Sequence, residues 1–181
     1  MKNEYDEILL NFSKLCPYIK PAIKSNNINI TYLTKENFNN YLFFQKALFY
    51  SKKLLEDNEY LSSFLIIIEP DNCFDIIWNK IEWVHFILKK IFSSKSILFG
   101  KFSKSNFQSN FIEKNTIMFV IRKSNIKIDK KFIKKNCIKN EIIKEFNEKN
   151  TISGYSIEDI YSDLDLSKKI YKILKNDLTS G

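Results

Sequence analysis

The most distinctive side chain in this sequence is its single arginine. Lys and Arg together number 29, and only Arg122, at the end of an apolar run, is an arginine. A guanidinium binds a carboxylate or phosphate through two parallel hydrogen bonds, a geometry that lysine cannot reproduce. We therefore expect Arg122 to hold an anionic group of a ligand. The alternative is a structural ion pair with Glu69, Asp71 or Glu113.

Cys16 and His85 are the other side chains with reactive chemistry. Cys16 precedes Pro17 at the end of an expected helix, where a thiolate can act as a nucleophile or a haem ligand. His85, the only histidine, lies one helical turn from Ile81 and Leu88 and can serve as a proximal haem ligand or a general base. Haem is therefore a candidate cofactor. The alternatives are a small buried cysteine and a core histidine with one satisfied hydrogen bond.

Three further residues mark positions where a ligand could bind. Glu69 and Asp71 follow an apolar strand, and the carboxyl edge of an α/β sheet is where ligands bind. The alternative is a plain turn in which Asp71 caps the next helix. Gly100 interrupts a strand, where it permits close approach of a ligand or marks a bulge. The expected ligand-binding set is Arg122, Cys16, Glu69, Asp71, His85 and Gly100.

Composition indicates one globular domain. The chain has 181 residues, 44% hydrophobic and 15% aromatic, which suffices for a sizeable core. No apolar run reaches the roughly 18 residues that span a bilayer, and the first ten residues lack a signal-like core. We expect a soluble, cytoplasmic protein that does not bind a membrane. Three cysteines without a CxxC and one histidine argue against a disulfide framework or a metal site.

The net charge of +8 does not by itself predict nucleic-acid binding. The lysines are spread over every segment, and no nucleic-acid motif accompanies them. Abundant Lys, Asn and Ile with almost no Arg or Gly is typical of an AT-rich coding sequence. Nucleic acid therefore ranks last among the expected partners.

Hydrophobic periodicity predicts alternating strands and helices. A first helix, Asn3–Leu15, should end at the two breaks made by Pro17 and Pro21. We expect Thr34 to cap the second helix and Asp71 or Asn72 the third. The strands are predicted at Ile28–Leu33, Phe64–Ile68, Ile97–Phe102 and Thr116–Lys123. The later helices are predicted at Lys35–Glu56, Cys73–Phe92, Asp129–Lys149 and Ser156–Asn176, with a break at Ser153-Gly154.

This order predicts an α/β (α+β) fold, a small mixed four-stranded sheet sandwiched by helices in the order α-β-α-β-α-β-β-α-α. Right-handed crossovers make the first three strands parallel, with Thr116–Lys123 antiparallel to Ile97–Phe102. The continuous apolar run Phe64–Ile68 should be a central strand covered on both faces. The order is that of a thioredoxin-like sandwich, without its CxxC. We expect an α/β domain over residues 1–150 and a helical C-terminal appendage over 151–181.

Two segments resemble an uncharacterised bacterial domain family. CPYIKPAI is similar to its Cys-Pro-Phe-Val-x-Pro-Ala opening. ILFGKF and IMFVIRKSNIKIDKKFI are similar to its Leu-x-x-Gly-x-Phe strand, its Leu-Leu-x-Ile-Arg strand and its Asp-x-x-Phe-Ile end. The resemblance covers about Leu15 to Ile133 and implies an accessory protein of a bacterial small-molecule pathway. That family usually has Phe-His-Pro after the first of these strands, whereas Ser103 and Lys104 follow Phe102 here, so a histidine role at that point is absent.

A looser resemblance, in element order alone, is to the YqcI/YcgG family of haem-dependent N-oxygenases. Three functions follow from these observations. The first is a small-molecule-binding or accessory biosynthetic domain whose anionic ligand is held by Arg122. The second is a non-catalytic protein–protein interaction module, with the amphipathic C-terminal helix Ile157 to Leu174 as one candidate surface. The third is a haem-dependent oxygenase-like protein.

Overall fold

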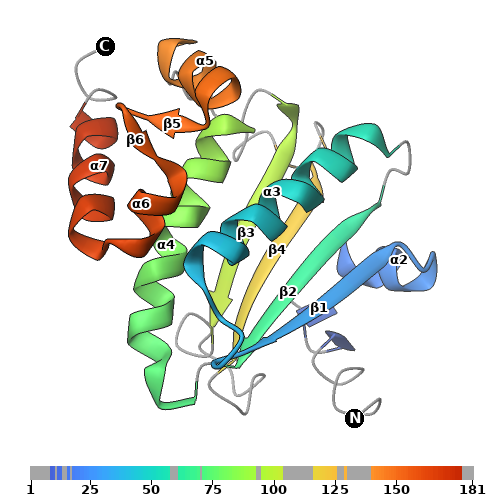
Figure 1. The fold of residues 1–181 in the computed structure, drawn as a ribbon. Coiled ribbons are helices and arrows are strands. Elements are labelled where there is room, and N and C mark those ends of the chain that lie inside the picture. Colours follow the sequence, from blue (N-terminus) through green and yellow to red (C-terminus); the bar gives the residue numbers. More distant parts are fainter. Residues whose placement is uncertain are drawn as a thin grey trace.

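The computed structural model describes residues 9–10, 12–13, 16, 18–57, 61–69, 71–92, 95–103, 116–125, 129 and 140–176. Within these ranges the chain forms one four-stranded mixed sheet with helices on both faces, so the predicted α/β fold is confirmed (Figure 1). No helix in the described part of the chain is long and apolar enough to cross a membrane.

The sheet contains β1 (Ile28–Thr34), β2 (Ser63–Glu69), β3 (Ile97–Ser103) and β4 (Ile117–Lys123), in the order β1-β2-β4-β3. β1 runs parallel to β2, and β4 runs antiparallel to both β2 and β3. The three predicted parallel strands therefore share one direction. β4 lies between two of them, which leaves β1 at one edge of the sheet and β3 at the other.

The two central strands, β2 and β4, are buried on both faces, as the unbroken apolar run Phe64–Ile68 predicts for β2. The face that we call the α3–α4 face is covered by α3 (Asn40–Glu56) and α4 (Phe74–Ile91). The opposite face, the α2 face, is covered by α2 (Ile19–Lys24) and by Phe12. Side chains alternate between the faces. Those on the α3–α4 face include Phe64, Ile66, Ile68, Ile117, Phe119 and Ile121, and those on the α2 face are Leu65, Ile67, Met118 and Val120.

The start of α3 differs from the prediction. The helix begins at Asn40 instead of Lys35, and Asn39, not Thr34, caps it. Thr34 is still part of β1, and a turn over residues 35–37 separates it from the helix. The Asn39 side-chain oxygen accepts hydrogen bonds from the backbone N–H groups two and three positions later, at 2.9 and 3.2 Å. This is the usual N-cap geometry.

Two other helix boundaries also differ from the prediction. A 3₁₀ turn, Asp71–Cys73, precedes α4 and places Cys73 at its N-cap position, so neither Asp71 nor Asn72 is the cap. Pro21 does not break the chain, because it is the third residue of α2. In the first turn of a helix a proline removes an N–H that has no partner within the helix.

The C-terminal part contains α5 (Asn140–Lys149), a short β5–β6 hairpin over residues 151–156, α6 (Ile157–Ser162) and α7 (Leu164–Asn176). The predicted break at Ser153-Gly154 is the hairpin turn, where both residues have positive φ. Asp129 is not helical, so the helix predicted from that residue was wrong at its start. The predicted last helix is interrupted at Asp163, which lies outside helical geometry and whose carboxylate caps α7.

The C-terminal helices pack on their own chain. Ile160, Tyr161, Ile170 and Leu174 belong to the same buried core as α3 and α4. The Tyr161 ring stacks on Phe44 of α3, with ring centroids 4.8 Å apart. Figure 1 shows α6 and α7 beside α4 on the α3–α4 side of the sheet. The core is continuous across residue 150. The division into an α/β domain over 1–150 and a helical appendage over 151–181 stays a prediction.

Candidate functional site

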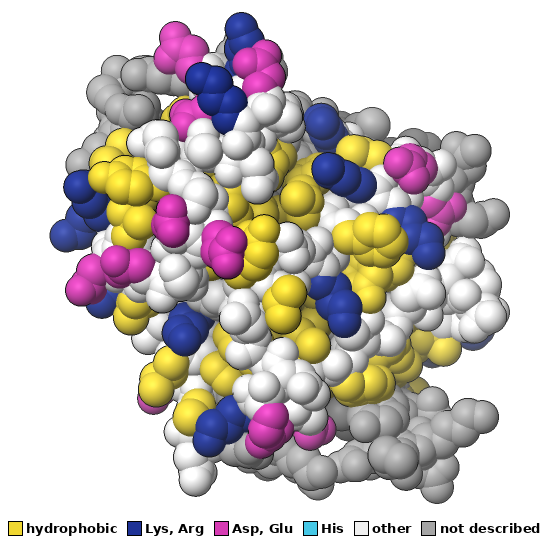
Figure 2. All heavy atoms as spheres, viewed as in Figure 1, with side chains coloured by type: hydrophobic (Ala, Val, Ile, Leu, Met, Phe, Trp, Pro, Cys, Tyr) yellow, Lys and Arg dark blue, Asp and Glu magenta, His cyan; other side chains and the backbone are white. Residues whose placement is uncertain are grey.

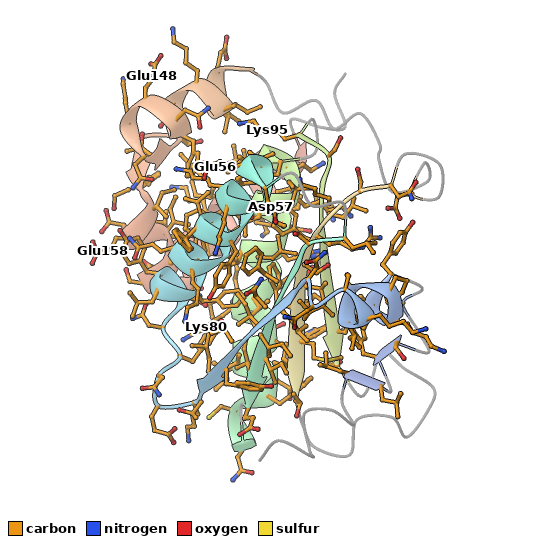
Figure 3. The ribbon with its side chains drawn as sticks, turned by 90° about the vertical axis from the view of Figure 1, so that its right-hand side faces the viewer. Glu56, Asp57, Lys80, Lys95, Glu148 and Glu158 are labelled. Atoms are coloured by element: carbon orange, nitrogen blue, oxygen red, sulfur yellow. The ribbon has the colours of Figure 1, made fainter. Side chains whose placement is uncertain are left out.

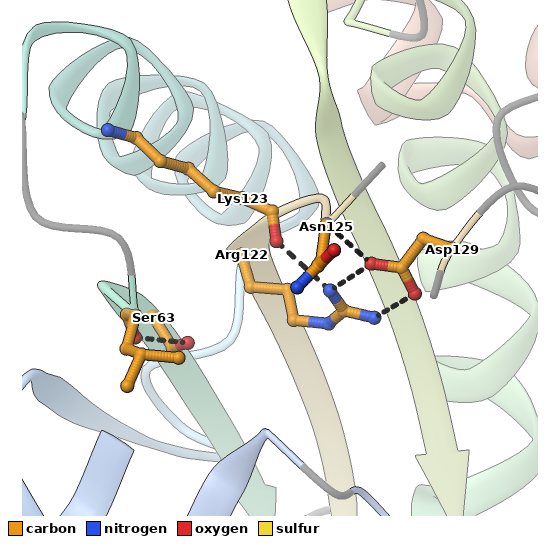
Figure 4. Close-up of polar contacts among 6 residues, drawn as sticks. Ser63, Arg122, Lys123, Asn125 and Asp129 are labelled. Atoms are coloured by element: carbon orange, nitrogen blue, oxygen red, sulfur yellow. Dashed lines mark hydrogen bonds and ion pairs between the residues drawn. The ribbon is translucent and has the colours of Figure 1, made fainter. Parts of the chain in front are cut away.

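Arg122 forms a bidentate ion pair with Asp129 (Figure 4). One terminal nitrogen donates to Asp129 Oδ2 at 2.8 Å and the other donates to Oδ1 at 2.9 Å. The first of these nitrogens also donates to the backbone oxygen of Lys123 at 3.0 Å. The Arg122 side chain is 14% exposed and the Asp129 side chain 1% exposed. This is the two-point geometry expected of an arginine, with a carboxylate of the chain itself as the partner.

The surroundings of this pair favour its charged form. The guanidinium carbon lies 4.1 Å from the centroid of the Tyr18 ring, within cation–π distance. Burial opposes ionisation of Asp129, but hydrogen bonds from Arg122 and from the backbone N–H of Asn125, at 2.7 Å, hold the pKa of Asp129 below its ordinary value. The same pairing raises the pKa of Arg122 in spite of its burial. The pair is therefore stable in its ionised state.

The alternative of a structural ion pair for Arg122 is confirmed, but its partner is Asp129, and neither Glu69 nor Asp71 takes that place. Arg122 pairs with Ser63 at the start of β2, whereas Glu69 ends that strand and Asp71 follows it, so both acids lie at the opposite end of the sheet. Glu113 lies outside the described residues. We did not name Asp129 as a partner, because we expected it to be the first residue of a helix.

Cys16 is a predicted site residue that lies near Arg122. It is half-buried against the α2-face core, and its negative charge when ionised contributes to the raised pKa of Arg122. Its backbone N–H donates to the carbonyl of Phe12 at 3.0 Å. Cys16 and Arg122 thus lie close together, and Gly100 pairs with Val120, two residues before Arg122 on β4. A role for Cys16 as nucleophile or haem ligand stays a prediction.

His85 lies on the other face of the sheet, between α4 and β3. Its Nε2 is 3.2 Å from the backbone oxygen of Phe99, and its ring meets Phe119 edge-on with centroids 6.0 Å apart. Burial lowers the pKa of His85 and so favours the neutral ring. Because Cys16 packs against the α2 face, these two residues cannot bind one haem iron together. A haem-binding role for either alone stays a prediction.

Gly100 is approached by a neighbour within its own strand. A Cβ at this position would lie 2.5 Å from the ring of Phe102. That ring lies over the glycine and meets Phe12 edge-on, with centroids 5.1 Å apart. The packing of Phe102 therefore accounts for a glycine here. Glu69 is exposed at the end of β2, as expected for a turn.

The sequence did not single out a buried lysine on β3. The Lys101 side chain is 6% exposed and forms an ion pair with Glu82 of α4. Its ammonium lies 3.6 Å from the centroid of the Trp78 ring. Burial lowers the pKa of Lys101, and the contact with Glu82 offsets part of that effect. No pattern distinguishes this lysine from the many exposed ones, and its charge is matched within the fold.

The backbone of β1 presents part of its N–H and C=O groups at the outer edge of the sheet. Asn27 O accepts a hydrogen bond from Ser63 N at 2.9 Å, in the seven-residue parallel register of β1 with β2. Backbone groups alternate in direction along a strand, so Ile28, Ile30 and Thr34 point their N–H and C=O groups away from β2. Within the described part of the chain no strand pairs with this side of β1.

The β1 edge is also uncharged. Residues 25–34 contain no Asp, Glu, Lys or Arg, in a chain that is 28% charged. In Figure 3, which looks toward this edge, β1 lies in front of the sheet between α3 and α2, and the six labelled charged side chains all come from other segments. Tyr32 of β1 is 37% exposed.

Exposed apolar side chains also lie on α3. The Tyr50 hydroxyl is 2.7 Å from Thr31 Oγ1, which ties α3 to β1. Phe49 and Leu42, on the outer side of the same helix, are 61% and 57% exposed. Figure 2 shows hydrophobic side chains among lysines on the side of the molecule that α3 covers.

We call the outer side of residues 28–34 the β1 edge surface.

Comparison with protein-family models, curated proteins and solved structures finds no match. The two family resemblances in the sequence therefore stay predictions. The function has to be inferred from the geometry of the chain itself.

Proposed function

We propose that this chain is a non-catalytic protein-interaction domain and that the β1 edge surface binds a strand of its partner. The observation that carries this proposal is a seven-residue edge strand in continuous register with β2, within a ten-residue uncharged segment.

Soluble proteins usually protect an edge strand from pairing. They place lysine or proline on it, shorten it, or interrupt it with a bulge. β1 has none of these features over Ile28–Thr34. An added strand would form backbone hydrogen bonds with the outward-facing groups of Ile28, Ile30 and Thr34, which is a common mode of peptide and protein recognition.

Ligand binding by Arg122 receives less support from the same geometry. Both terminal nitrogens already donate to Asp129. A carboxylate or phosphate ligand would have to displace Asp129 and leave a carboxylate that is 1% exposed without its cation, at a cost of about 3–5 kcal/mol. The Arg122 ligand site, the haem-dependent alternative and a partner on the C-terminal helix stay predictions.

Photo-crosslinking in cells that express the protein tests the proposal. A photoreactive amino acid replaces Asn29, whose exposed side chain lies on β1. The comparison is with the same chain carrying Ile30→Pro, which removes an outward-facing N–H and leaves the β1–β2 hydrogen bonds in place. We expect the crosslinked partner to be lost in the proline variant.

The matched control places the same photoreactive group at Gln45, an exposed position on α3. Crosslinks from Gln45 should be indifferent to Ile30→Pro. Circular dichroism of the variant should show an intact fold. Equal crosslinking from Asn29 with and without the proline would reject the proposal.

A further inference from the structure

We infer that the outer side of α3 binds an amphipathic helix of a partner protein, one whose apolar side chains are flanked by Asp or Glu. The inference goes beyond the proposed function, because it concerns another surface and does not depend on β1. Four side chains of α3 form this surface, which we call the α3 stripe: Leu42, Lys46, Phe49 and Lys53.

The spacing of these four residues places them along one line of the helix. Side chains four and seven positions apart lie on the same side of an α-helix. Leu42 and Phe49 are seven positions apart, about 10.5 Å along the axis, and a lysine follows each of them by four positions. The opposite side of α3 faces the core and carries the buried residues Phe43, Ala47, Ser51 and Leu54.

The apolar members of the stripe are accessible to a partner. Phe49 is the most exposed large apolar side chain among the described residues, and Leu42 is also more than half exposed. Figure 1 shows α3 in front of the sheet, with no other labelled element over it. A partner helix can therefore lie along α3 without displacing any described part of the chain.

The charge of α3 selects the chemistry of this partner. Residues 40–55 contain three lysines and no Asp or Glu. None of the salt bridges between described residues involves Lys46, Lys52 or Lys53. A helix that packs its apolar side chains on the stripe brings its flanking positions next to these ammonium groups. Acidic residues at those positions form ion pairs across the contact, whereas lysines there are repelled.

The shape of the stripe favours a helix over an anionic membrane. Helices that lie in a membrane surface bury a broad apolar face in the lipid. The α3 stripe is narrow, because the exposed polar residues Gln45 and Lys52 lie beside it. A narrow apolar line with a seven-residue repeat is the geometry of packing between two helices.

Fluorescence anisotropy with two synthetic peptides tests the inference on the full-length chain. Both peptides are amphipathic helices of about three heptads with leucine on one side, and their flanking positions carry either glutamate or lysine. We expect saturable binding of the glutamate peptide in the micromolar range and no binding of the lysine peptide. Equal binding of both peptides, or binding of neither, would overturn the inference.

Substitution of the apolar residues identifies the surface. Leu42→Ser and Phe49→Ser should each raise the Kd of the glutamate peptide about tenfold, because each removes an apolar anchor. Ile76→Ser on α4 is the matched control, since Ile76 and Leu42 are both 57% exposed. The three variants should keep the wild-type circular dichroism spectrum. A control that weakens binding as much as the stripe variants do would count against the α3 stripe.

Charge reversal separates local contacts from the net charge of +8. The double variant Lys46→Glu, Lys53→Glu should raise the Kd of the glutamate peptide about tenfold and permit binding of the lysine peptide. The double variant Lys20→Glu, Lys24→Glu changes the net charge equally at exposed positions of α2 and should do neither. Equal effects of the two double variants would show that binding follows net charge alone and would reject the inference.

Vesicles of phosphatidylcholine and phosphatidylserine test the membrane alternative. The wild-type chain should not sediment with them at physiological salt. Sedimentation that Phe49→Ser abolishes would assign the α3 stripe to a membrane and overturn the inference. Ile30→Pro, which tests the β1 edge surface, should leave the Kd of the glutamate peptide unchanged, so failure of either proposal leaves the other standing.

Discussion

At the scale of single residues, the Arg122–Asp129 pair shows why one arginine stands among so many lysines. The two parallel hydrogen bonds, the Lys123 carbonyl and the Tyr18 ring together engage the planar guanidinium. A lysine ammonium could occupy the position but not satisfy both carboxylate oxygens and stack on the ring. The pair therefore fastens the segment that follows β4 to the end of the sheet.

Replacing either partner should lower the free energy of unfolding. We expect Arg122→Lys and Asp129→Asn each to cost about 1–3 kcal/mol, because each leaves a buried polar partner incompletely bonded. Urea denaturation at pH 7 measures the effect, with the exposed Lys52→Ala as control. A loss no larger than that of the control would contradict the structural role.

The pH dependence of stability should report the same pair. The folded-state pKa of Asp129 lies below its ordinary value of 3.8, so its stabilisation is complete above that value and is lost as pH falls toward the folded-state pKa. The wild-type chain should therefore lose more stability below pH 4 than Asp129→Asn does. Urea denaturation of both chains at pH 4.5 and at pH 3 gives the free energy of unfolding at each pH. An equal drop in this free energy for the two chains would argue against the ion pair.

At the scale of elements, the packing of β3 depends on Gly100. The Phe102 ring occupies the space that a side chain at Gly100 would need and is held there by Phe12. An aromatic ring that covers a glycine on an edge strand is a known device in sheets. The glycine thus belongs to the α2-face core.

A double-mutant cycle measures this dependence. We expect Gly100→Ala to destabilise the chain by about 1–3 kcal/mol, because the Phe102 ring must leave its contact with Phe12. In a Phe102→Leu background the same change should cost far less, since the ring that it displaces is gone. Additive effects of the two substitutions would reject the explanation.

At the scale of the whole molecule, the C-terminal helices complete the core. Ile160 is fully buried, and Tyr161 lies between Phe44 of α3 and Trp83 of α4. Removal of these contacts would expose the outer sides of both helices. The chain should therefore unfold as one cooperative unit.

Ile160→Ala tests that cooperativity. We expect a loss of about 2–5 kcal/mol and a lower midpoint for a single transition, because the substitution leaves a cavity in a shared core. Tryptophan fluorescence and circular dichroism should give coincident curves, with the 39%-exposed Ile173→Ala as control. A separate early transition of the C-terminal part would show that residues 151–181 form an independent appendage.

The sequence by itself determined which segments form the four strands and the α/β class of the fold. The apolar run at 64–68 has no face that could meet water, so it had to be a central strand, and the helical repeat of 77, 81, 84 and 88 had to lie against the sheet. Helix boundaries were less predictable. Asn39 and Thr34 are both suitable caps, and the length of β1, set by its pairing with β2, decided between them.

Only the tertiary structure decided which carboxylate pairs with Arg122 and which strands lie beside β1. Arg122 could have paired with several carboxylates, and the direction of β4 brings it to the start of β2, away from Glu69 and within reach of Asp129. The alternation of Ile28–Leu33 predicts a strand equally well at an edge or in the middle of a sheet. Its place at the edge follows from the strand order, in which β1 pairs with β2 and the other side of β2 pairs with β4. Pairing between strands distant in sequence is not encoded in either strand alone.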